Sequence, residues 1–482
     1  MRKSIINSIL YLTVISFIIK IMGFVFRIYL SNVIGAEGMG LYQLILSIYA
    51  LGATISTVGI STALSRLVAI NEKYGRRILK TGIIITEALS VFAMLLIFIK
   101  SKDISIYFLK DERCITSIKI ISLSFPAISL YACLNGYFNG ISKMKFPMTG
   151  QLIEQIVRIA FVIIFVKDAM GEGLESALLK TAMGIFLGEY ISVFYLYFKY
   201  RMNLKYEKNS YTKKTFFKDI LKINVPVSLS GVFQTVISTL ESAFIPNLFV
   251  TYGLMRNEAI SILGVTKGMA MPLIFFPTFI LSSVSTVSLP SISRAQSKEN
   301  TIQIKSTTEK TLRLSLIISF YVTVIYIKYG EYICNIMYHE SSVSSTLKLM
   351  SIIIPFMYLN IGMSGILNGL GKQVGVMICG ISDGIIRIVI MYFLIPTYGL
   401  YGYIITLLIC EIILTLSCFL LLHSGGNIKL SMKKWISGPL VATICGLLAS
   451  IKLQGNLTGI FVFTMVYFAI IFINNIKFLK KM

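Results

Sequence analysis

Long apolar stretches separated by short polar breaks run along the whole chain. A helix needs about 20 mostly apolar residues to cross the hydrocarbon core of a membrane, and the sequence holds about fourteen stretches near that length. They lie at residues 5–33, 42–68, 79–99, 116–140, 147–167, 176–198, 223–250, 266–290, 311–329, 346–369, 374–395, 400–422, 435–452 and 457–475. The pattern predicts an all-α polytopic membrane protein with about 14 transmembrane helices.

Composition agrees with this pattern. The chain has 482 residues, of which 56% are hydrophobic and 14% charged, and a soluble protein this apolar could not cover its own surface. The first stretch could be read as a cleaved signal peptide, but Lys20 interrupts it, no small-residue cleavage site follows, and many further spans do. We therefore expect a permanent first helix. The seven cysteines show no paired metal-ligand spacing, so we expect them to be packing residues and expect no metal site.

The formal net charge of +24 raises the question of nucleic-acid binding, because basic patches bind phosphate backbones. The distribution of the charges decides against it. If the N-terminus is cytoplasmic, the basic residues gather in the inner loops, whereas outer loops such as 31–38 and 171–176 are acidic or neutral. The positive-inside rule then places both termini in the cytoplasm. Anionic lipids are the partners this charge predicts.

Two distant stretches repeat each other. They read SFPAISLYACLNGYFNGISKMKFPMTGQLIEQIVRI (124–159) and IIPFMYLNIGMSGILNGLGKQVGVMICGISDGIIRI (353–388). A constant offset of 229 aligns residues of rare type in the two copies, and a looser match aligns Glu189 with Glu411. The pairs at offset 229 are Pro126 with Pro355, Gly136 with Gly365, Asn139 with Asn368, Lys143 with Lys372, Glu154 with Asp383, and Arg158 with Arg387.

The repeat predicts the domain organisation. We expect an N-terminal six-helix lobe at 1–199, a basic cytoplasmic linker at 200–222, a C-terminal six-helix lobe at 223–423, and helices 13 and 14 with a basic tail at 424–482. Six is even, so the two lobes are parallel repeats about an axis along the membrane normal, an arrangement that recurs in alternating-access transporters. Transport along a path between the lobes is the function this organisation predicts.

Charged residues inside the spans are the candidates for function, because a charge at the bilayer centre costs roughly 2.5–3.5 kcal/mol on insertion scales. Lys20 and Arg27 lie nearly two turns apart in the first span and form a cationic strip. One interpretation is that the strip lines a cavity and binds a phosphate or pyrophosphate. The other is that Arg27 reaches the outer headgroups while Lys20 pairs with an acid.

Glu241 and Lys267 lie in the spans that correspond to the first two. Glu241 could pair with Lys20 or Arg27, bind a coupling ion, or be structural. We group these four residues as candidates for the substrate cavity. A second group is expected to act in a gate or in lobe structure, and each of its members also has a purely structural explanation; it comprises Arg66, Arg294, Glu154, Arg158, Asp383, Arg387, Glu189 and Glu411.

The stretch PLIFFPTFILSSVSTVSLPSISR (272–294) holds three prolines in one predicted span. Proline frees backbone carbonyls and bends helices, so the span suits a gating element or a statically kinked helix. No glycine-rich phosphate loop of the P-loop type is present. We expect no enzyme activity and no cofactor, with a coupling ion or the membrane potential as the driving force.

Four stretches carry a resemblance to a known family: GFVFRIYLSNVIGAEGMGLYQ (23–43), VGISTALSRLVAINEKYG (58–75), LNGYFNGISKMKFP (134–147) and SSVSTVSLPSISRAQSK (282–298). With them the chain resembles the multidrug/oligosaccharidyl-lipid/polysaccharide exporter superfamily, in particular its stage V sporulation protein B branch of polysaccharide-biosynthesis transporters. The resemblance covers nearly the whole chain. It implies a flippase that moves a lipid-linked, pyrophosphate-bearing sugar precursor, of the undecaprenyl type, for peptidoglycan of the spore cortex.

The resemblance also implies where substrate binds. In the related lipid II flippases, cationic residues of helices one, two and eight line the central cavity, and Lys20, Arg27 and Lys267 are the positions here that match. Those flippases have an arginine inside helix two, whereas this chain has Thr54 and Ile55 in that region.

Other functions stay open at this point. The chain could export another lipid-linked polysaccharide unit, act as a cation-coupled drug antiporter, or serve as a non-transporting scaffold that recruits cell-wall synthesis proteins through its linker. An antiporter for cationic drugs needs acids in its cavity, whereas the first span offers Lys20 and Arg27. A scaffold would depend on the linker and not on the cations within the spans.

Overall fold

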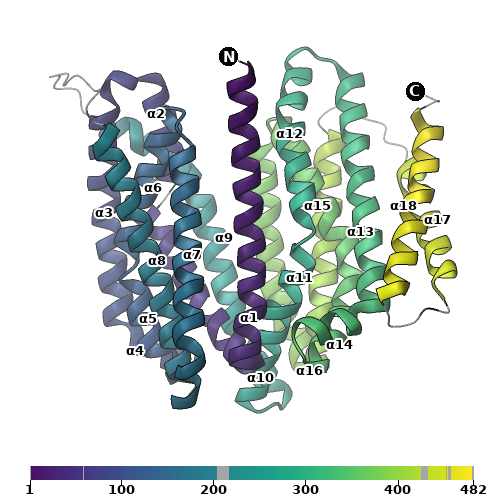
Figure 1. Ribbon diagram of the computed structural model, residues 1–482, viewed down its shortest axis with the longest axis horizontal. Coiled ribbons are helices and arrows are strands. Elements are labelled where there is room, and N and C mark those ends of the chain that lie inside the picture. The colour runs from purple at the N-terminus through teal and green to yellow at the C-terminus, as the bar shows by residue number, and fades with distance from the viewer. Residues whose placement is uncertain are drawn as a thin grey trace. The chain divides into compact units, whose positions relative to one another are not determined.

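The computed structural model describes residues 2–57, 59–203, 216–424, 432–451, 453 and 457–479. Almost all of these residues are helical, and the described ranges contain no strand. Figure 1 shows the long helices of each part of the chain running side by side. The predicted all-α fold class is therefore confirmed.

The chain divides into two compact units, Met1–Pro246 (unit 1) and Asn247–Met482 (unit 2). This division follows packing within each unit and cuts α9 (Phe217–Tyr252) near its end. It does not test the lobe and linker boundaries that the repeat predicts, which lie at 199, 200–222 and 423. These boundaries stay predictions. Residues 204–215 of the expected linker, and 425–431, 452, 454–456 and 480–482 of the expected C-terminal segment and its basic tail, lie outside the described residues.

Unit 1 is a helical bundle. In it, α7 packs along α8, and both α2 and α3 pack against α6. Its elements are α1 (Arg2–Thr57), α2 (Ile60–Ile70), η1 (Glu72–Tyr74), α3 (Gly75–Ile99), α4 (Ser101–Asp103), η2 (Ile104–Phe108), η3 (Glu112–Cys114), α5 (Ile115–Ser122), α6 (Phe125–Gly140), α7 (Lys145–Ala169), η4 (Met170–Glu172), α8 (Leu174–Asn203) and most of α9.

Unit 2 repeats the pattern of long helices. Here α12 and α13 pack against α15, and α17 packs on α18. Its elements are α10 (Arg256–Leu263), η6 (Gly264–Ala270), α11 (Met271–Phe275), α12 (Thr278–Ser297), α13 (Thr301–Met337), α14 (Ser341–Met350), η7 (Ser351–Ile353), α15 (Ile354–Gly369), α16 (Gln373–Ser424), α17 (Met432–Ala449) and α18 (Leu457–Leu479).

Glycine kinks divide the two longest helices. The 56 residues of α1 would extend about 84 Å at 1.5 Å per residue, far beyond the ~30 Å hydrocarbon core. Gly35 breaks α1 with φ 67° and ψ −174°, and Gly399 breaks α16 with φ 57° and ψ −131°. Only glycine adopts such angles readily. Each long helix therefore holds two predicted spans joined by a tight turn.

These kinks explain why the count of spans differs from the expected number. Among the described residues, eight helices are long and apolar enough to cross a membrane, or up to nine if the bent pair Glu112–Ser122 and Phe125–Gly140 forms one span. The expectation was about 14. Two predicted spans merge in Val14–Ile70 and two in Gln373–His423, while Ile436–Ala449 and Leu457–Ile473 are shorter apolar helices. Polar side chains keep α9 and α12 out of the set.

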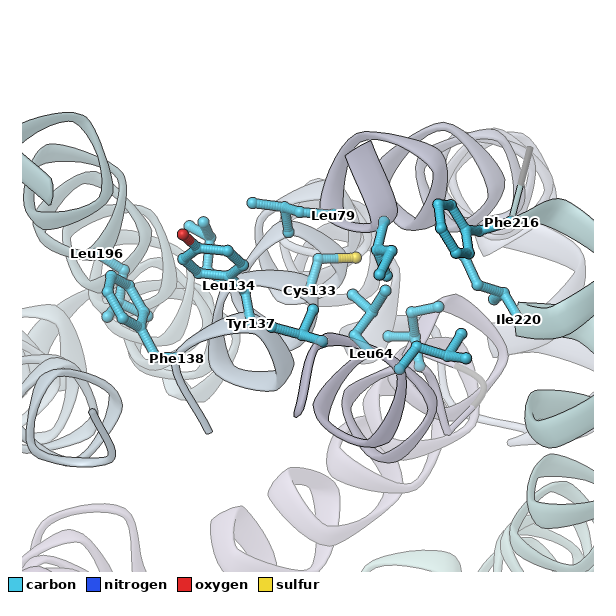
Figure 2. Close-up of a cluster of buried hydrophobic side chains, with 13 residues drawn as sticks. Leu64, Leu79, Cys133, Leu134, Tyr137, Phe138, Leu196, Phe216 and Ile220 are labelled. Atoms are coloured by element: carbon cyan, nitrogen blue, oxygen red, sulfur yellow. The ribbon is translucent and has the colours of Figure 1, made fainter. Parts of the chain in front are cut away.

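The cores of the two units use matching positions. In unit 1, Leu64, Leu134 and Tyr137 are buried in one cluster with Phe138 and Leu196. Figure 2 shows this cluster, with Phe138 beside Leu196 and Phe216 beside Ile220. The corresponding cluster of unit 2 contains Ile292, Met363, Ile366, Leu367 and Cys418. Three of these pairs match at the offset of 229, Leu64 matches Ile292 at 228, as Arg66 matches Arg294, and Leu196 matches Cys418 at 222, as Glu189 matches Glu411. The repeated residues are therefore also repeated in packing.

Candidate functional site

A buried group of charged and polar side chains lies where α1, α7 and α8 of unit 1 meet. Arg158 forms an ion pair with Glu154 one turn earlier in α7. The Tyr49 hydroxyl, from the second half of α1, donates a hydrogen bond to Glu189 Oε1 of α8 at 2.6 Å. Glu189 is only 6% exposed. We call Glu154, Arg158, Glu189 and Tyr49 the unit 1 charge cluster.

Small residues of α8 allow this close arrangement. A Cβ atom at Gly188 would lie 2.9 Å from the carbonyl oxygen of Glu154, and one at Gly184 would lie 3.1 Å from Val162 Cγ2. Glycines four residues apart form the spacing that lets membrane helices approach closely. The close approach of α7 and α8 places Glu189 beside the Glu154–Arg158 pair.

Unit 2 holds a corresponding group. Arg387 Nη2 lies 2.5 Å from Asp383 Oδ2, and Asn360 Nδ2 of α15 donates a hydrogen bond to Glu411 Oε2 at 2.6 Å. Asp383 is 6% exposed and Asn360 7%. We call Asp383, Arg387, Glu411 and Asn360 the unit 2 charge cluster. Both clusters lie within apolar helices, where mutual pairing lowers the cost of burying charge.

The sequence analysis predicted the acid–arginine pairs and the two glutamates as separate features, and the structure brings each pair together with its glutamate. The hydrogen-bond partners of the glutamates, Tyr49 and Asn360, were missed. The two partners are not equivalent by the repeat, since Asn360 matches Tyr131 at offset 229. Tyr131 instead donates its hydroxyl to the carbonyl oxygen of Pro147 at 2.8 Å. No sequence signal distinguishes Tyr49 from the other tyrosines of the apolar spans.

The predicted cationic strip lies on the first half of α1. Lys20 is exposed and Arg27 is half-buried. Arg27 and Arg158 both interact electrostatically with Tyr42, so Arg27 neighbours the unit 1 charge cluster. Arg158 pairs with Glu154 and Glu189 is held by the Tyr49 hydroxyl, so the cluster has one carboxylate more than guanidinium, a negative charge near Arg27 when all groups are ionised.

Glu241 and Lys267 are found in different units. Glu241 is 6% exposed in α9, and hydrogen bonds from α9 reach the second half of α1, where Thr239 Oγ1 donates to the Ser47 carbonyl oxygen at 3.1 Å. Lys267 is half-buried in η6, which is a π-helix. The assignment of both residues to a substrate cavity, and the pairing of Glu241 with Lys20 or Arg27, stay predictions.

The two predicted gate arginines lie near matching helix ends. Arg66 is exposed in α2, and Arg294 is exposed near the end of α12, where its Nε donates to the Pro290 carbonyl oxygen at 3.2 Å. Exposed arginines at helix ends fit a gate and also fit contact with lipid headgroups. In the described part of the chain, no three His, Cys, Asp or Glu side chains are arranged to hold a metal ion.

Comparison with known families decides the relationship. The model of the family described as "Polysaccharide biosynthesis protein" matches residues 5–296. The chain belongs to this family. It is a member of the multidrug/oligosaccharidyl-lipid/polysaccharide exporter superfamily, as its resemblances in sequence predicted.

Individual relatives match most of the chain. Stage V sporulation protein B of Bacillus subtilis (strain 168) is 24% identical over 462 residues, which cover 93% of this chain and 89% of that protein. A solved structure of the lipid II flippase MurJ in an inward closed conformation matches with a TM-score of 0.75 at 16% identity, covering 98% and 99% of the two chains. An inward-facing multidrug transporter of the MATE family matches with a TM-score of 0.67 at 15% identity, covering 85% and 96%.

These relationships establish a multi-pass membrane protein of a superfamily of flippases and exporters that handle polysaccharides or lipid-linked precursors. The structural matches show the shared fold.

Proposed function

We propose that this protein is a flippase that moves an undecaprenyl-pyrophosphate-linked sugar precursor from the inner to the outer leaflet of a bacterial cytoplasmic membrane, for peptidoglycan of the spore cortex. The observation that carries the proposal is the match to stage V sporulation protein B over 93% of this chain. The family match over residues 5–296 supports the class of substrate. In this proposal both termini are cytoplasmic.

Arg27 is the residue on which the proposal places substrate binding. Arg27 is half-buried, and a guanidinium suits bidentate binding of a pyrophosphate. Lys20, on a nearby face of the same helix, adds a second positive charge. The sugar and pyrophosphate occupy the cationic region while the lipid tail stays in the bilayer. Lys267 and Glu241 complete the proposed cavity.

The driving force is proposed to be the membrane potential or a coupling ion. A precursor headgroup that carries negative charge gains about 2.3 kcal/mol per elementary charge per 100 mV. Buried carboxylates of the two charge clusters offer groups that respond to a cation. Transport in vesicles, with an imposed potential or an imposed ion gradient, distinguishes the two sources.

The test is a leaflet-specific assay. Purified protein is reconstituted in vesicles with a fluorescent lipid-linked sugar pyrophosphate, and the fraction in each leaflet is followed with a membrane-impermeant quencher. Arg27→Ala should slow translocation at least about tenfold, because a charge-assisted bidentate contact is lost. Arg27→Lys should retain part of the rate. Arg201→Ala removes an exposed arginine at the end of α8 and should match the wild type.

The competing functions give different results in the same vesicles. A drug antiporter would move a cationic dye against an ion gradient and leave the labelled precursor in place. A scaffold would move neither compound, and its cellular function would be lost when the 200–222 linker is replaced. Equal translocation rates for the wild type and Arg27→Ala would remove Arg27 from the site.

A further inference from the structure

The eighth predicted span is broken in unit 2. The predicted span, 266–290, covers most of the π-helical η6, α11 and the larger part of α12, and α10 precedes it. The α-helix is interrupted at Phe276 and Pro277, between α11 and α12. Figure 1 shows α11 and α12 as successive segments along one direction. We call the helical segment before the break, α10 to α11, the first arm and α12 the second arm. Lys267 lies on the first arm and Arg294 on the second.

Side-chain hydroxyls satisfy the carbonyl groups at the break. Pro277 has no N–H, so the carbonyl oxygen of Leu273 loses its ordinary helical partner. The Tyr326 hydroxyl donates to that oxygen at 2.7 Å. The Tyr358 hydroxyl donates to the next one, the Ile274 carbonyl oxygen, also at 2.7 Å.

A third hydroxyl completes the arrangement. Thr278 Oγ1 donates to the carbonyl oxygen of Phe275 at 2.6 Å. Three successive carbonyl groups, from residues 273 to 275, thus accept hydrogen bonds from side chains of α13, α15 and α12. Tyr326 is 7% exposed and Tyr358 is fully buried. Within a membrane such carbonyl groups need internal partners, so the tyrosines stabilise the broken form of the span.

The matching part of unit 1 lacks these features. At offset 229, Tyr326 corresponds to Ile97 and Tyr358 to Ser129. At offset 228, Pro277 corresponds to Tyr49, whose helix continues without interruption to Thr57. Tyr49 instead joins α1 to Glu189 of α8. Unit 1 also interrupts its second predicted span, but further along, between α1 and α2 near Gly59, so a break at this position with its carbonyl groups held by tyrosine hydroxyls is found in unit 2 and not at the matching position of unit 1.

We propose that Tyr326 and Tyr358 are positioning residues for transport, which set the angle between the two arms of the broken span and so place Lys267 and Arg294. The role in transport rests on the proposed flippase function. The effect of the tyrosines on the angle between the two arms does not depend on which substrate is moved. When the tyrosine hydroxyls no longer donate to the carbonyl groups, the angle between the two arms changes. The tyrosines therefore control movement of the span and do not bind the precursor.

The first experiment measures the distance between the two arms. Nitroxide labels are attached at Asn257→Cys and Ser297→Cys, which replace exposed residues on the two arms. The half-exposed Cys379 and Cys445 are changed to serine, and the other native cysteines are buried. Pulsed electron paramagnetic resonance then gives the distance distribution between the labels in reconstituted protein.

The variants remove single hydroxyl groups. Tyr326→Phe, Tyr358→Phe and the double variant should broaden the distance distribution or add a second population. Tyr329→Phe is the matched control, since Tyr329 is also fully buried in α13 and its hydroxyl has no hydrogen-bond partner among the described residues. It should give the wild-type distribution. If the melting curve shows that the double variant does not fold, the distance distributions of the two single variants test the proposal.

The second experiment separates positioning from binding. In the vesicle assay, each tyrosine variant should change the translocation rate by about tenfold, the factor expected when one buried hydrogen bond no longer favours one of two arrangements. Equilibrium binding of the labelled precursor should stay within about twofold. A purely structural role would lower the amount of folded protein and leave the rate per folded molecule unchanged.

The outcomes keep the two proposals apart. Distance distributions that are the same in the wild type and in both single variants would overturn the positioning role, even with full flippase activity. Altered distributions in a protein that moves no precursor would support the hinge geometry while the flippase proposal fails. A rate unaltered in folded variants with altered distributions would refute the link to transport.

Discussion

Glu154 and Arg158 form a buried ion pair. Each neutralises the charge of the other, but the pair as a whole adds little to the stability of the fold. Removal of one partner of such a pair leaves an uncompensated buried charge, which costs about 3–5 kcal/mol, whereas replacement of both by apolar residues is often neutral. We therefore expect Glu154→Met to lower the unfolding free energy strongly, and Glu154→Met with Arg158→Met to restore most of it. Denaturant unfolding in detergent measures both.

An exposed pair supplies the control for this prediction. Lys100 Nζ lies 2.9 Å from Asp103 Oδ2, and the two side chains are 61% and 52% exposed. Pairs in water contribute little to stability. Lys100→Ala should leave the melting temperature unchanged. A double variant as unstable as Glu154→Met alone would contradict the explanation by charge neutralisation.

Tyr49 donates the hydrogen bond that satisfies a buried carboxylate. Tyr49→Phe keeps the ring and removes the donor to Glu189, which should cost about 1–3 kcal/mol of unfolding free energy. In the double variant Tyr49→Phe with Glu189→Leu, the carboxylate is gone, so the two single effects should not add. A double-mutant cycle measures the coupling. Fully additive effects would show that the hydroxyl and the carboxylate do not interact.

Contacts within one helix could be predicted from the sequence, whereas contacts between distant helices could not. The Glu154–Arg158 and Asp383–Arg387 pairs could be predicted because four residues is one helical turn, so each pair shares a face. Tyr49 and Glu189 are 140 residues apart, and nothing in the apolar spans around them fixes how the helices rotate against each other. Hydrogen bonds between distant helices depend on that rotation, so neither Tyr49 nor Asn360 could be predicted.

At the scale of elements, Gly35 divides α1 by its backbone conformation alone. A Cβ atom there would meet nothing within 4 Å, so Gly35→Ala tests conformation without a steric clash. Gly35 has φ 67° and ψ −174°, a region of backbone conformation that is essentially restricted to glycine and costs other residues about 1–3 kcal/mol, and we expect the unfolding free energy to fall by that amount. Gly171→Ala also has open space and has no positive φ, so its melting curve should match the wild type.

The packing of α7 on α8 gives a steric counterpart. At Gly188 a Cβ atom would lie 2.9 Å from a backbone oxygen, that of Glu154, whereas at Gly184 its nearest neighbour is a valine methyl group at 3.1 Å. Backbone cannot move aside as a side chain can. Gly188→Ala should therefore destabilise the fold by about 1–3 kcal/mol, the usual cost of overpacking, and Gly184→Ala by less. Equal melting temperatures for the two variants would contradict this difference.

Element positions followed from the sequence more closely than element breaks. Apolar length fixed where helices cross the membrane, since a span must be apolar over about 20 residues. The merging of two spans into α1 and into α16 was not foreseen, because the chain stays helical up to one glycine. The break at Pro277 was foreseen as a bend, but its satisfaction by Tyr326 and Tyr358 depends on helices that are distant in sequence.

At the scale of the whole molecule, the repeat and the charge distribution make one joint prediction about sidedness. An even number of spans per lobe places matching loops of the two lobes on the same side of the membrane. Lysine-rich loops should then be cytoplasmic in both lobes. An odd number would invert the second lobe and place its lysine-rich loops outside.

Labelling of single cysteines on intact cells tests this orientation. A membrane-impermeant maleimide should label Gly171→Cys in unit 1 and Ser342→Cys in unit 2, which are exposed positions in predicted outer loops. Lys73→Cys and Lys298→Cys, exposed in predicted inner loops, should react only after the cells are permeabilised. Reversed labelling in unit 2 alone would mean inverted lobes, so that the matched acid–arginine pairs would be related by an axis in the membrane plane. Reversed labelling in both units would keep the lobes parallel and place the termini outside, which contradicts the positive-inside assignment.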